Sequence, residues 1–349
     1  MKGFKLTRQV RFALLIALLV LSLVGVAVQA QDGPPLPGEV IAGDLSAPRG
    51  VAFDANGNLL VSVAGTGGDV EMSANSPEGT PSTFNIGLTG VVLSIAADGT
   101  SSPLIQGLPS YAGESEITGV YRAIPNGDAI WLVTTSAGPG AFWGSTVVEL
   151  DAATLMSRRV IAMTPYEVAN NPDGNEIDSN VSDIAWLSDG TMLIVDAGAN
   201  TLYSWTEADG LQVAQTWSDN SVPTSIEVAE NDDVYIGFLG AGLAPGAGKV
   251  EHWSGGELLE TFGGLNAVTD ILLDGETLYA VQLVIFGEQG PGPGNVVMVN
   301  AEGATPVAEG IPAPFGIAMG ADGALYVSFG TIAFAPGMTG GVLRVEPGM

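Results

Sequence analysis

The chain has 349 residues, of which 38 are acidic and 10 are basic, so its formal net charge is −28. This balance excludes nucleic acid as an expected partner, because phosphate contacts require basic side chains. The absence of cysteine excludes disulfides, thiolate metal sites and a lipid-modified cysteine anchor, while 46% hydrophobic residues and 49 glycines are typical of strands and turns around a buried core.

The N-terminal residues predict an export signal. Four basic residues within positions 1–11 precede an apolar run over 12–28, which ends in the small-residue pattern Val28-Gln29-Ala30. This order is typical of a bacterial signal peptide, here residues 1–30, followed by a short linker over 31–38. The alternative is a retained membrane anchor, because the run is only slightly shorter than the ~20 residues of a span.

Cleavage after Ala30 would remove four basic residues and no acidic residue, so the mature chain would carry a formal net charge of −32. The expected location is therefore outside the cell, in the periplasm or on the exterior of the cell envelope, without stable membrane insertion after cleavage. The acidity itself is typical of a solvated surface, and bound cations are the alternative interpretation.

Residues 39–349 repeat one phrase six times: a small residue, an apolar strand, an Asn, Asp or Gly turn, and a second apolar strand. The copies begin at Arg49, Thr118, Ser182, Thr224, Thr269 and Phe315. In the last four copies, aligning Ile184, Ile226, Ile271 and Ile317 gives spacings of 42, 45 and 46 residues. A period of ~40–50 residues with four short strands per unit predicts an all-β fold, a six-bladed β-propeller in one domain.

The two termini are predicted to close the ring together. The sixth copy ends after its third strand, residues 341–346, whereas residues 39–50 resemble the end of the fifth copy running into the sixth. Residues 39–44 are therefore expected to supply the missing outer strand of the last blade. Closure would remove an open sheet edge that invites aggregation.

The long loops are predicted to lie on one face of the ring, named here the long-loop face. They cover residues 65–89, 136–145, 164–180, 238–248, 285–294 and 330–340, whereas the turns on the opposite face are short. Long loops on a rigid scaffold commonly carry function. We therefore expect any binding site on this face.

Several phrases in these loops resemble one known family. They are the segment 166–180 with its Asn170-Asn171-Pro172-Asp173-Gly174 core, Asp196-Ala-Gly-Ala-Asn200, Val222-Pro-Thr-Ser225 and Ala64-Gly-Thr-Gly-Gly68. Taken in their order along the chain, they resemble the ScyD/ScyE family of exported bacterial propellers, which belongs with the NHL and gluconolactonase-like propellers. Some members are encoded in cyanobacterial gene clusters for scytonemin, an aromatic sunscreen. The resemblance implies a fold and an exported location but no established reaction, and this chain lacks the cysteines that many relatives carry near residue 65.

The loop that enters the third copy is a candidate cation site. It offers Asp173, Asn175, Glu176, Asp178 and Asn180 around Gly174. Oxygen side chains at close spacing suit a hard cation such as Ca²⁺, although the spacing is not that of an EF-hand. The alternative is a loop in which Asn and Asp side chains bond their own backbone.

The starts of the inner strands are expected to line a central channel. They are Arg49, Thr118, Ser182, Asp183, Thr224, Thr269, Asp270 and Phe315. Asp183 and Asp270 could hold a cation or polarise a substrate; alternatively these residues hydrate a water-filled channel, and Arg49 neutralises one aspartate.

Apolar residues in the long loops form a third candidate. They are Phe142, Trp143, Phe238, Leu243, Phe286, Phe334 and Met338. If exposed together, they would bind an aromatic ligand or a partner. Alternatively they pack as a lid over the ring.

Nucleophilic catalysis lacks a plausible centre, because the only histidine, His252, falls in an outer strand pattern. The leading interpretation is an exported, non-enzymatic propeller that binds a small ligand, an aromatic one among the candidates, or a protein partner through its long-loop face. The alternative is a metal-dependent hydrolase resembling gluconolactonases, with its cation in the central channel. A structural protein of the cell surface is a third interpretation.

Overall fold

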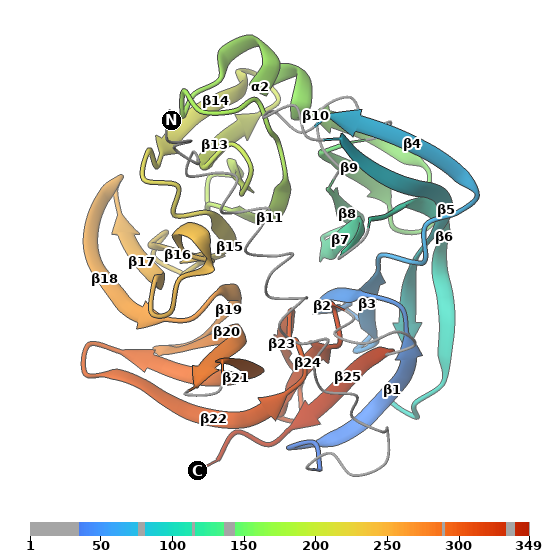
Figure 1. Ribbon diagram of the computed structural model, residues 1–349, viewed down its shortest axis with the longest axis vertical. Coiled ribbons are helices and arrows are strands. Elements are labelled where there is room, and N and C mark those ends of the chain that lie inside the picture. Colours follow the sequence, from blue (N-terminus) through green and yellow to red (C-terminus); the bar gives the residue numbers. More distant parts are fainter. Residues whose placement is uncertain are drawn as a thin grey trace, which may run out of the picture.

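The computed structural model describes residues 35–75, 81–113, 116–135, 144–287, 290–332 and 339–348. Within these ranges the protein consists of β-strands arranged in sheets around a central axis (Figure 1), apart from helix α2 (Thr164–Asn170) and a short 3-10 helix, η1 (Ala241–Leu243). The architecture is an all-β propeller, as the sequence predicts. Among the described residues, no helix is long and apolar enough to cross a lipid bilayer.

Four sheets have four antiparallel strands each. The first contains β11 (Val181–Trp186), β12 (Met192–Asp196), β13 (Thr201–Thr206) and β14 (Gly210–Thr216). The second contains β15 (Pro223–Val228), β16 (Val234–Phe238), β17 (Gly248–Ser254) and β18 (Glu257–Leu265). The third contains β19 (Val268–Asp274), β20 (Thr277–Gly287), β21 (Gly290–Asn300) and β22 (Gly303–Ile311). The fourth contains β23 (Ile317–Met319), β24 (Leu325–Phe329), β25 (Gly340–Val345) and β1 (Glu39–Leu45).

A fifth sheet has nine strands. It contains β2 (Pro48–Phe53), β3 (Leu59–Val63), β5 (Pro81–Ile95), β6 (Ser101–Ala112), β7 (Ile117–Asn126), β8 (Ala129–Thr134), β9 (Thr146–Asp151) and β10 (Ser157–Ala162), with β4 (Val70–Asn75) paired to β5. β6 and β7 pair only over Ser110–Ala112 and Ile117–Gly119. The described strands therefore form five hydrogen-bonded sheets, where the sequence predicts six blades, because the end of β6 continues into β7.

The N-terminal strand joins the C-terminal sheet. β1 pairs antiparallel with β25, from Glu39 opposite Arg344 to Leu45 opposite Gly340. Its Ile41 and Leu45 pack against the core cluster that contains Val61 and Val342. The predicted role of residues 39–44 as the outer strand of the last sheet is confirmed.

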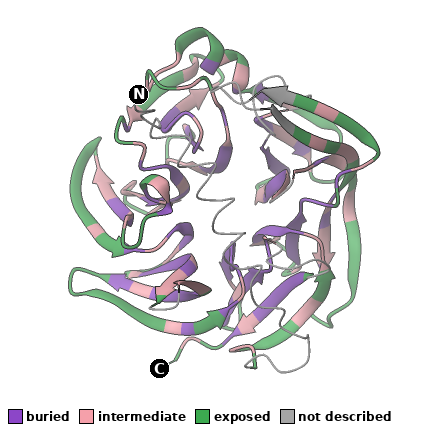
Figure 2. Cartoon of the chain, in the orientation of Figure 1, coloured by how far each residue is buried: buried purple, intermediate pink, exposed green. Residues whose placement is uncertain are grey.

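The core lies between neighbouring sheets, because their inner strands are apolar along most of their length. Every residue of β3, β8 and β12 is buried. The outer strands β18 and β22 expose most of their residues, β14 has no buried residue, and Figure 2 shows burial decreasing from the axis outward. Tight turns between first and second strands depend on Asp and Gly: Asp54 accepts the amide N–H groups of Asn56 and Asn58, and Gly57 has a φ of 79°.

A recurring backbone hydrogen bond places the long loops on one face. The residue that follows a second strand donates its N–H to a carbonyl just before the first strand of the same sheet, as in Ala64 to Ala47 and Leu239 to Val222. The same bond joins Leu283 to Ala267 and Gly330 to Pro312. The connections that leave second strands therefore meet those that enter first strands at the long-loop face.

Candidate functional site

The two axial aspartates connect neighbouring inner strands. Asp183 in β11 accepts the N–H of Ile184 at Oδ1 (2.9 Å) and the N–H of Ile226 in β15 at Oδ2 (3.0 Å). Asp270 in β19 repeats this arrangement with the N–H of Ile271 and the N–H of Ile317 in β23, both at 2.9 Å. Each carboxylate thus supplies acceptors for edge amides that no strand pairs.

Arg122 lies between these carboxylates. Its Nη1 and Nη2 donate to Oδ2 and Oδ1 of Asp270 at 3.0 and 2.7 Å, and its Nε lies 3.0 Å from Oδ1 of Asp183. The side chains are nearly buried: Arg122 is 9% exposed, Asp183 is 6% exposed and Asp270 is 2% exposed. β7, which carries Arg122, and β19 lie on opposite sides of the axis in Figure 1. The guanidinium therefore spans the axis and joins its two sides in a bidentate ion pair.

The sequence predicts that Asp183 and Asp270 face the axis and that Arg49 could neutralise one of them. Asp183 and Asp270 do face the axis, but their partner is Arg122, not Arg49 and not water alone. Burial would lower the pKa of Arg122, but Asp183 and Asp270 outweigh it and raise that pKa. Burial raises the pKa of Asp183 to about 7 despite the opposing charge of Arg122, and the charge of Asp270 adds to that rise.

A third carboxyl group, that of Glu227, lies near Asp183 and Asp270. Ser225 in β15 is equivalent to Asp183 in β11, and Glu227 comes two residues after Ser225. Burial, followed by the charges of Asp183 and Asp270, raises the pKa of Glu227 to about 8. Glu227 therefore keeps its proton to a higher pH than a solvent-exposed glutamate does.

Sequence reasoning missed Arg122 because it aligned the second copy incorrectly. Arg122 pairs with Val133 of β8 as Asp183 pairs with Val195 of β12, so these two residues are equivalent. The sequence alignment placed Thr118 where the structure has Tyr121, a shift of three residues. The shared Gly-Val dipeptide of the first two copies suggested the wrong register, whereas the strand pairing is the signal that gives the right one.

Arg49 occupies the long-loop end of the axis. Its Nη2 donates to Glu116 Oε1 (2.7 Å) and to the carbonyl of Ile117 (2.6 Å), and its guanidinium carbon lies 4.8 Å from the ring centre of Tyr121 and 4.9 Å from that of Phe315. Arg49 is buried, whereas the Glu116 side chain is 37% exposed. Burial would lower the pKa of Arg49, but Tyr121 and Glu116 outweigh it and raise that pKa. Tyr121 and Glu116 were not predicted as part of this group.

Hydrogen bonds at the axis connect successive inner strands from β2 to β23, and a bond from Ser328 of the second strand β24 completes the circle. They are Arg49 to the Ile117 carbonyl, Arg122 to the Ser182 carbonyl, Ile226 to Asp183, Thr224 to the Val268 carbonyl, Ile317 to Asp270, and Ser328 to the Arg49 carbonyl. The polar residues predicted to line a channel, apart from Thr118, are thus largely occupied in holding the ring together.

The predicted cation loop is partly self-bonded. Asp173 accepts the N–H and Nδ2 of Asn175 at 2.9 and 2.8 Å, and Nδ2 of Asn200 at 3.0 Å. The N–H of Asn180 donates to Asp196 Oδ1 at 2.7 Å. Within the described ranges, no three His, Cys, Asp or Glu side chains are grouped closely enough to hold a metal ion. The alternative of a self-capping loop therefore accounts for Asp173 and Asn175.

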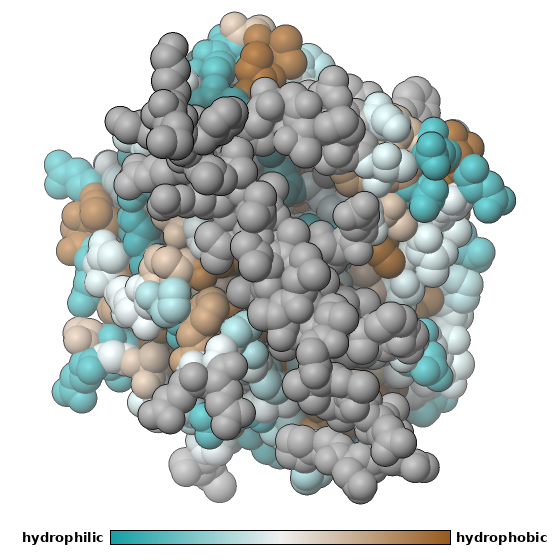
Figure 3. Space-filling model, in the orientation of Figure 1, coloured by the Kyte–Doolittle hydropathy of each residue, from teal (hydrophilic) through white to brown (hydrophobic). Residues whose placement is uncertain are grey.

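The predicted apolar surface is largely covered where it can be seen. Phe238 is 0% exposed and packs edge-on against Trp217, and Leu243 is buried with Ala267 and Val284. Phe286 is half-buried against the same cluster. Figure 3 shows apolar and polar residues interspersed over the described part of the face in view. Phe142, Trp143, Phe334 and Met338 lie outside the described residues.

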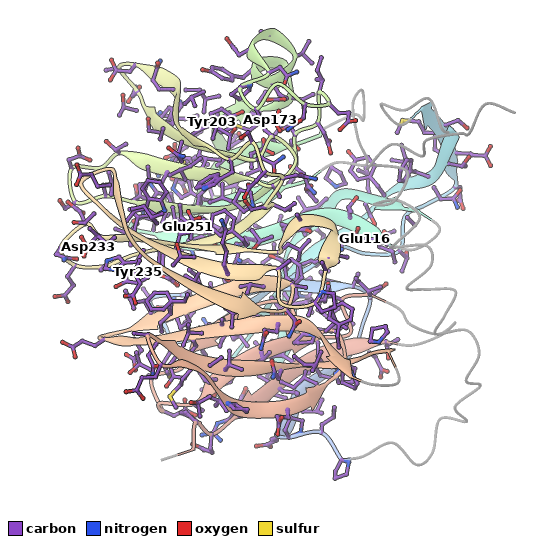
Figure 4. All side chains as sticks on the ribbon, turned by 60° about the vertical axis from the view of Figure 1, so that its left-hand side comes forward. Glu116, Asp173, Tyr203, Asp233, Tyr235 and Glu251 are labelled. Atoms are coloured by element: carbon purple, nitrogen blue, oxygen red, sulfur yellow. The ribbon has the colours of Figure 1, made fainter. Side chains whose placement is uncertain are left out.

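His252 is not part of a catalytic group in the described structure. Its ring stacks on Tyr235 at 4.3 Å, and its Nε2 lies 3.0 Å from Asp233 Oδ2. Figure 4 shows Asp233 and Tyr235 on the outer side of the molecule, well away from Glu116. This agrees with the prediction that His252 is an outer strand residue.

Comparison with known proteins reveals the fold. No protein-family model and no curated protein matches the chain. A structure from Thermus thermophilus described as an oxidoreductase (glucose dehydrogenase) is 13% identical, with a TM-score of 0.55 over 89% of this chain and 100% of that one. A structure described as a gluconolactonase is 10% identical, with a TM-score of 0.53 over 90% of this chain and 94% of that one. The structure of streptogramin B lyase is 11% identical, with a TM-score of 0.52 over 89% of this chain and 97% of that one. At these identities the likeness shows the β-propeller fold alone, and the resemblance to the ScyD/ScyE family stays a prediction.

Proposed function

We propose that the chain is an exported, non-catalytic propeller of six blades that binds a small ligand or a protein partner at its long-loop face. The six-blade count is supported by the six inner strands, β2, β7, β11, β15, β19 and β23, which follow one another around the axis through the hydrogen bonds described above. The nine-stranded sheet then counts as two blades, joined where β6 meets β7. Export is supported by the signal-like pattern of residues 1–30.

One observation carries the non-catalytic part of the proposal: the axial carboxylate oxygens are already engaged. Both oxygens of Asp270 accept from Arg122 and from backbone amides, and Asp183 does the same with Arg122, Ile184 and Ile226. A cation placed between these aspartates would meet the positive guanidinium of Arg122. The residues present therefore do not fit an axial metal centre, and the gluconolactonase-like alternative rests on the shared fold.

The long-loop end of the axis supports a binding role. Glu116 is the partly exposed member of a group whose other members, Arg49, Tyr121 and Phe315, are buried. Arg49 holds the Glu116 carboxylate through a charge-assisted hydrogen bond, which fixes its position at the surface. Phe286 offers an apolar surface at the same face. A ligand with a hydrogen-bond donor or positive group would match Glu116, and a ligand with a ring would match Phe286.

The proposal is tested by native mass spectrometry of the mature chain purified from its own host without chelators. We expect a small-molecule or protein adduct in the wild type, its loss in Glu116→Gln and Phe286→Asp, and its retention in the control Leu259→Asp, which alters an exposed residue of the outer strand β18. A bare wild-type chain, or an adduct that survives both substitutions, would contradict binding at this face. A lactone hydrolysis assay with added Ca²⁺ tests the alternative, and turnover that Asp270→Asn abolishes would favour it.

A further inference from the structure

Four carboxylates gather where helix α2, the loop over 171–180 and the turn over 196–200 meet. They belong to Glu167, Asp173, Asp178 and Asp196, and the charges of the three aspartates act on Glu167. The hydroxyl of Tyr203, which is labelled in Figure 4, donates to Glu167 Oε2 at 3.3 Å. In the described structure no lysine, arginine or histidine forms an ion pair with any of the four.

Glu167 is the member that the fold leaves least satisfied. Its side chain is 0% exposed, and its Oε1 has no hydrogen-bond partner among the described residues. A buried carboxylate oxygen without a partner costs free energy, so such an atom usually marks a missing partner. Two amide oxygens of the same loop, Oδ1 of Asn171 and Oδ1 of Asn180, are likewise buried and unpartnered.

The other carboxylates have different roles. Asp196 is saturated: it accepts the N–H groups of Asn180, Gly198 and Ala199 and the hydroxyl of Ser179. It therefore fixes the loop and adds negative charge. Gly198 packs so closely on this loop that a Cβ there would lie 2.9 Å from the Asn180 nitrogen and 3.1 Å from Asp178 Cγ. The turn thus holds Asp178 and Asn180 against each other.

The charge of the cluster is unbalanced. Burial, followed by the charges of Asp196 and Asp173, raises the pKa of Glu167 to about 7, and burial with Asp196 raises that of Asp178 to about 6. Burial also raises the pKa of Asp196.

We propose that this cluster binds a hard divalent cation of the Ca²⁺ class, with Glu167 Oε1, Asn180 Oδ1 and a carboxylate oxygen of Asp178 as donors. The donors are all oxygen, which suits Ca²⁺ and not a thiolate- or imidazole-binding metal. No three acidic side chains converge in the described structure, so the proposed donor set combines two carboxylates with one amide oxygen. A site with few charged ligands belongs to the weak range, with Kd of about 10⁻⁴ to 10⁻³ M. This inference is independent of the proposed function. It revises the sequence prediction by adding Glu167, by assigning Asp173 to the loop's own hydrogen bonds, and by not using Glu176.

The first experiment measures the Tm of the full mature chain in EDTA and in Ca²⁺ at ten times the Kd. Ligand binding at that concentration is expected to raise Tm by about 2 °C for a domain of this size. Glu167→Gln should remove the Ca²⁺ shift, and its Tm in EDTA should exceed that of the wild type because a buried charge is gone. The control Glu276→Gln, at an exposed turn, should keep the wild-type shift.

A second measurement does not depend on stability. Tb³⁺ replaces Ca²⁺ at oxygen sites, and Tyr203, in contact with Glu167, would sensitise its emission on ultraviolet excitation. We expect emission that Ca²⁺ displaces in the wild type and in Glu276→Gln, and no such emission in Glu167→Gln. Absence of both the Ca²⁺ shift and the terbium signal in the wild type would overturn the proposal, as would their persistence in Glu167→Gln.

Discussion

The substitution Arg122→Met removes the charge that spans the axis and leaves the rest of the ring intact. Asp183 and Asp270 then remain buried, at 6% and 2% exposure, without a cation. Breaking a buried ion pair by removing one partner costs about 3–5 kcal/mol of unfolding free energy. With an unfolding entropy of about 2.1 cal/mol/K per residue, a domain of about 300 residues should lose about 5–8 °C in Tm.

A multiple-mutant comparison separates lost charge from lost packing. Adding Asp183→Asn and Asp270→Asn to Arg122→Met removes the uncompensated charges while keeping side-chain size, so the triple variant should regain most of the lost stability. Thermal unfolding followed by circular dichroism and calorimetry measures both. A loss below about 1 kcal/mol in Arg122→Met, on the order of a surface pair, or a triple variant whose loss equals the sum of its single variants, would refute the reasoning.

Three further predictions concern pH, close packing and ring closure. The pKa of Glu227 in the folded protein, about 8, lies above its ordinary value of 4.5, so its contribution to stability is complete below pH 4.5 and is lost as the pH rises through 8. Tm should therefore fall between about pH 5 and 9, and it should fall less steeply in Glu227→Gln. Identical slopes in the two proteins would contradict this. Gly50→Ala would place a Cβ 2.8 Å from Arg122 Cγ and from the Tyr121 carbonyl oxygen, so it should cost about 1–3 kcal/mol in urea unfolding, while Gly263→Ala, with nothing within 4 Å, should be close to neutral. Deleting residues 39–45 exposes the edge of β25 and removes Ile41 and Leu45 from the core, so it should lower Tm and produce aggregates on size-exclusion chromatography; an unchanged monomer would argue against closure by β1.

The sequence predicts the fold well because the residues that repeat are the buried side chains packed between neighbouring sheets. Ile184, Ile226, Ile271 and Ile317 are all buried at equivalent positions, so their spacing reveals the repeat. The closing role of residues 39–44 was visible for the same reason. The continuation of β6 into β7 was not, because it depends on backbone pairing over three residues and not on a side-chain pattern.

The axial group could be predicted only in part. Asp183 and Asp270 follow the repeat and were identified, whereas Arg122 was missed because the second copy was aligned three residues out of register. Its ion pair with Asp270 also joins residues 148 positions apart, and no local sequence pattern indicates such a long-range contact. Phe238 was expected near the surface because loop residues usually lie there, but the chain folds it under Lys249 and against Trp217.

The acidic loop illustrates a different limit. Asp173 and Asn175 form the self-capping turn that their residue types favour, so the local alternative was available from sequence. Glu167 was not considered, because a glutamate in a short helix carries no mark of burial in the sequence. Only the packing of α2 against Tyr203 makes its carboxylate a buried group.

Arg122 closes the axis and occupies the space between Asp183 and Asp270 that an axial cation would need. A crystal structure grown in excess Ca²⁺ tests this arrangement most directly, with anomalous scattering to identify the ion. We expect the Arg122 guanidinium in contact with both Asp183 and Asp270, and no calcium peak between them. A calcium peak between the two aspartates, with Arg122 turned away, would contradict it and would favour the hydrolase alternative.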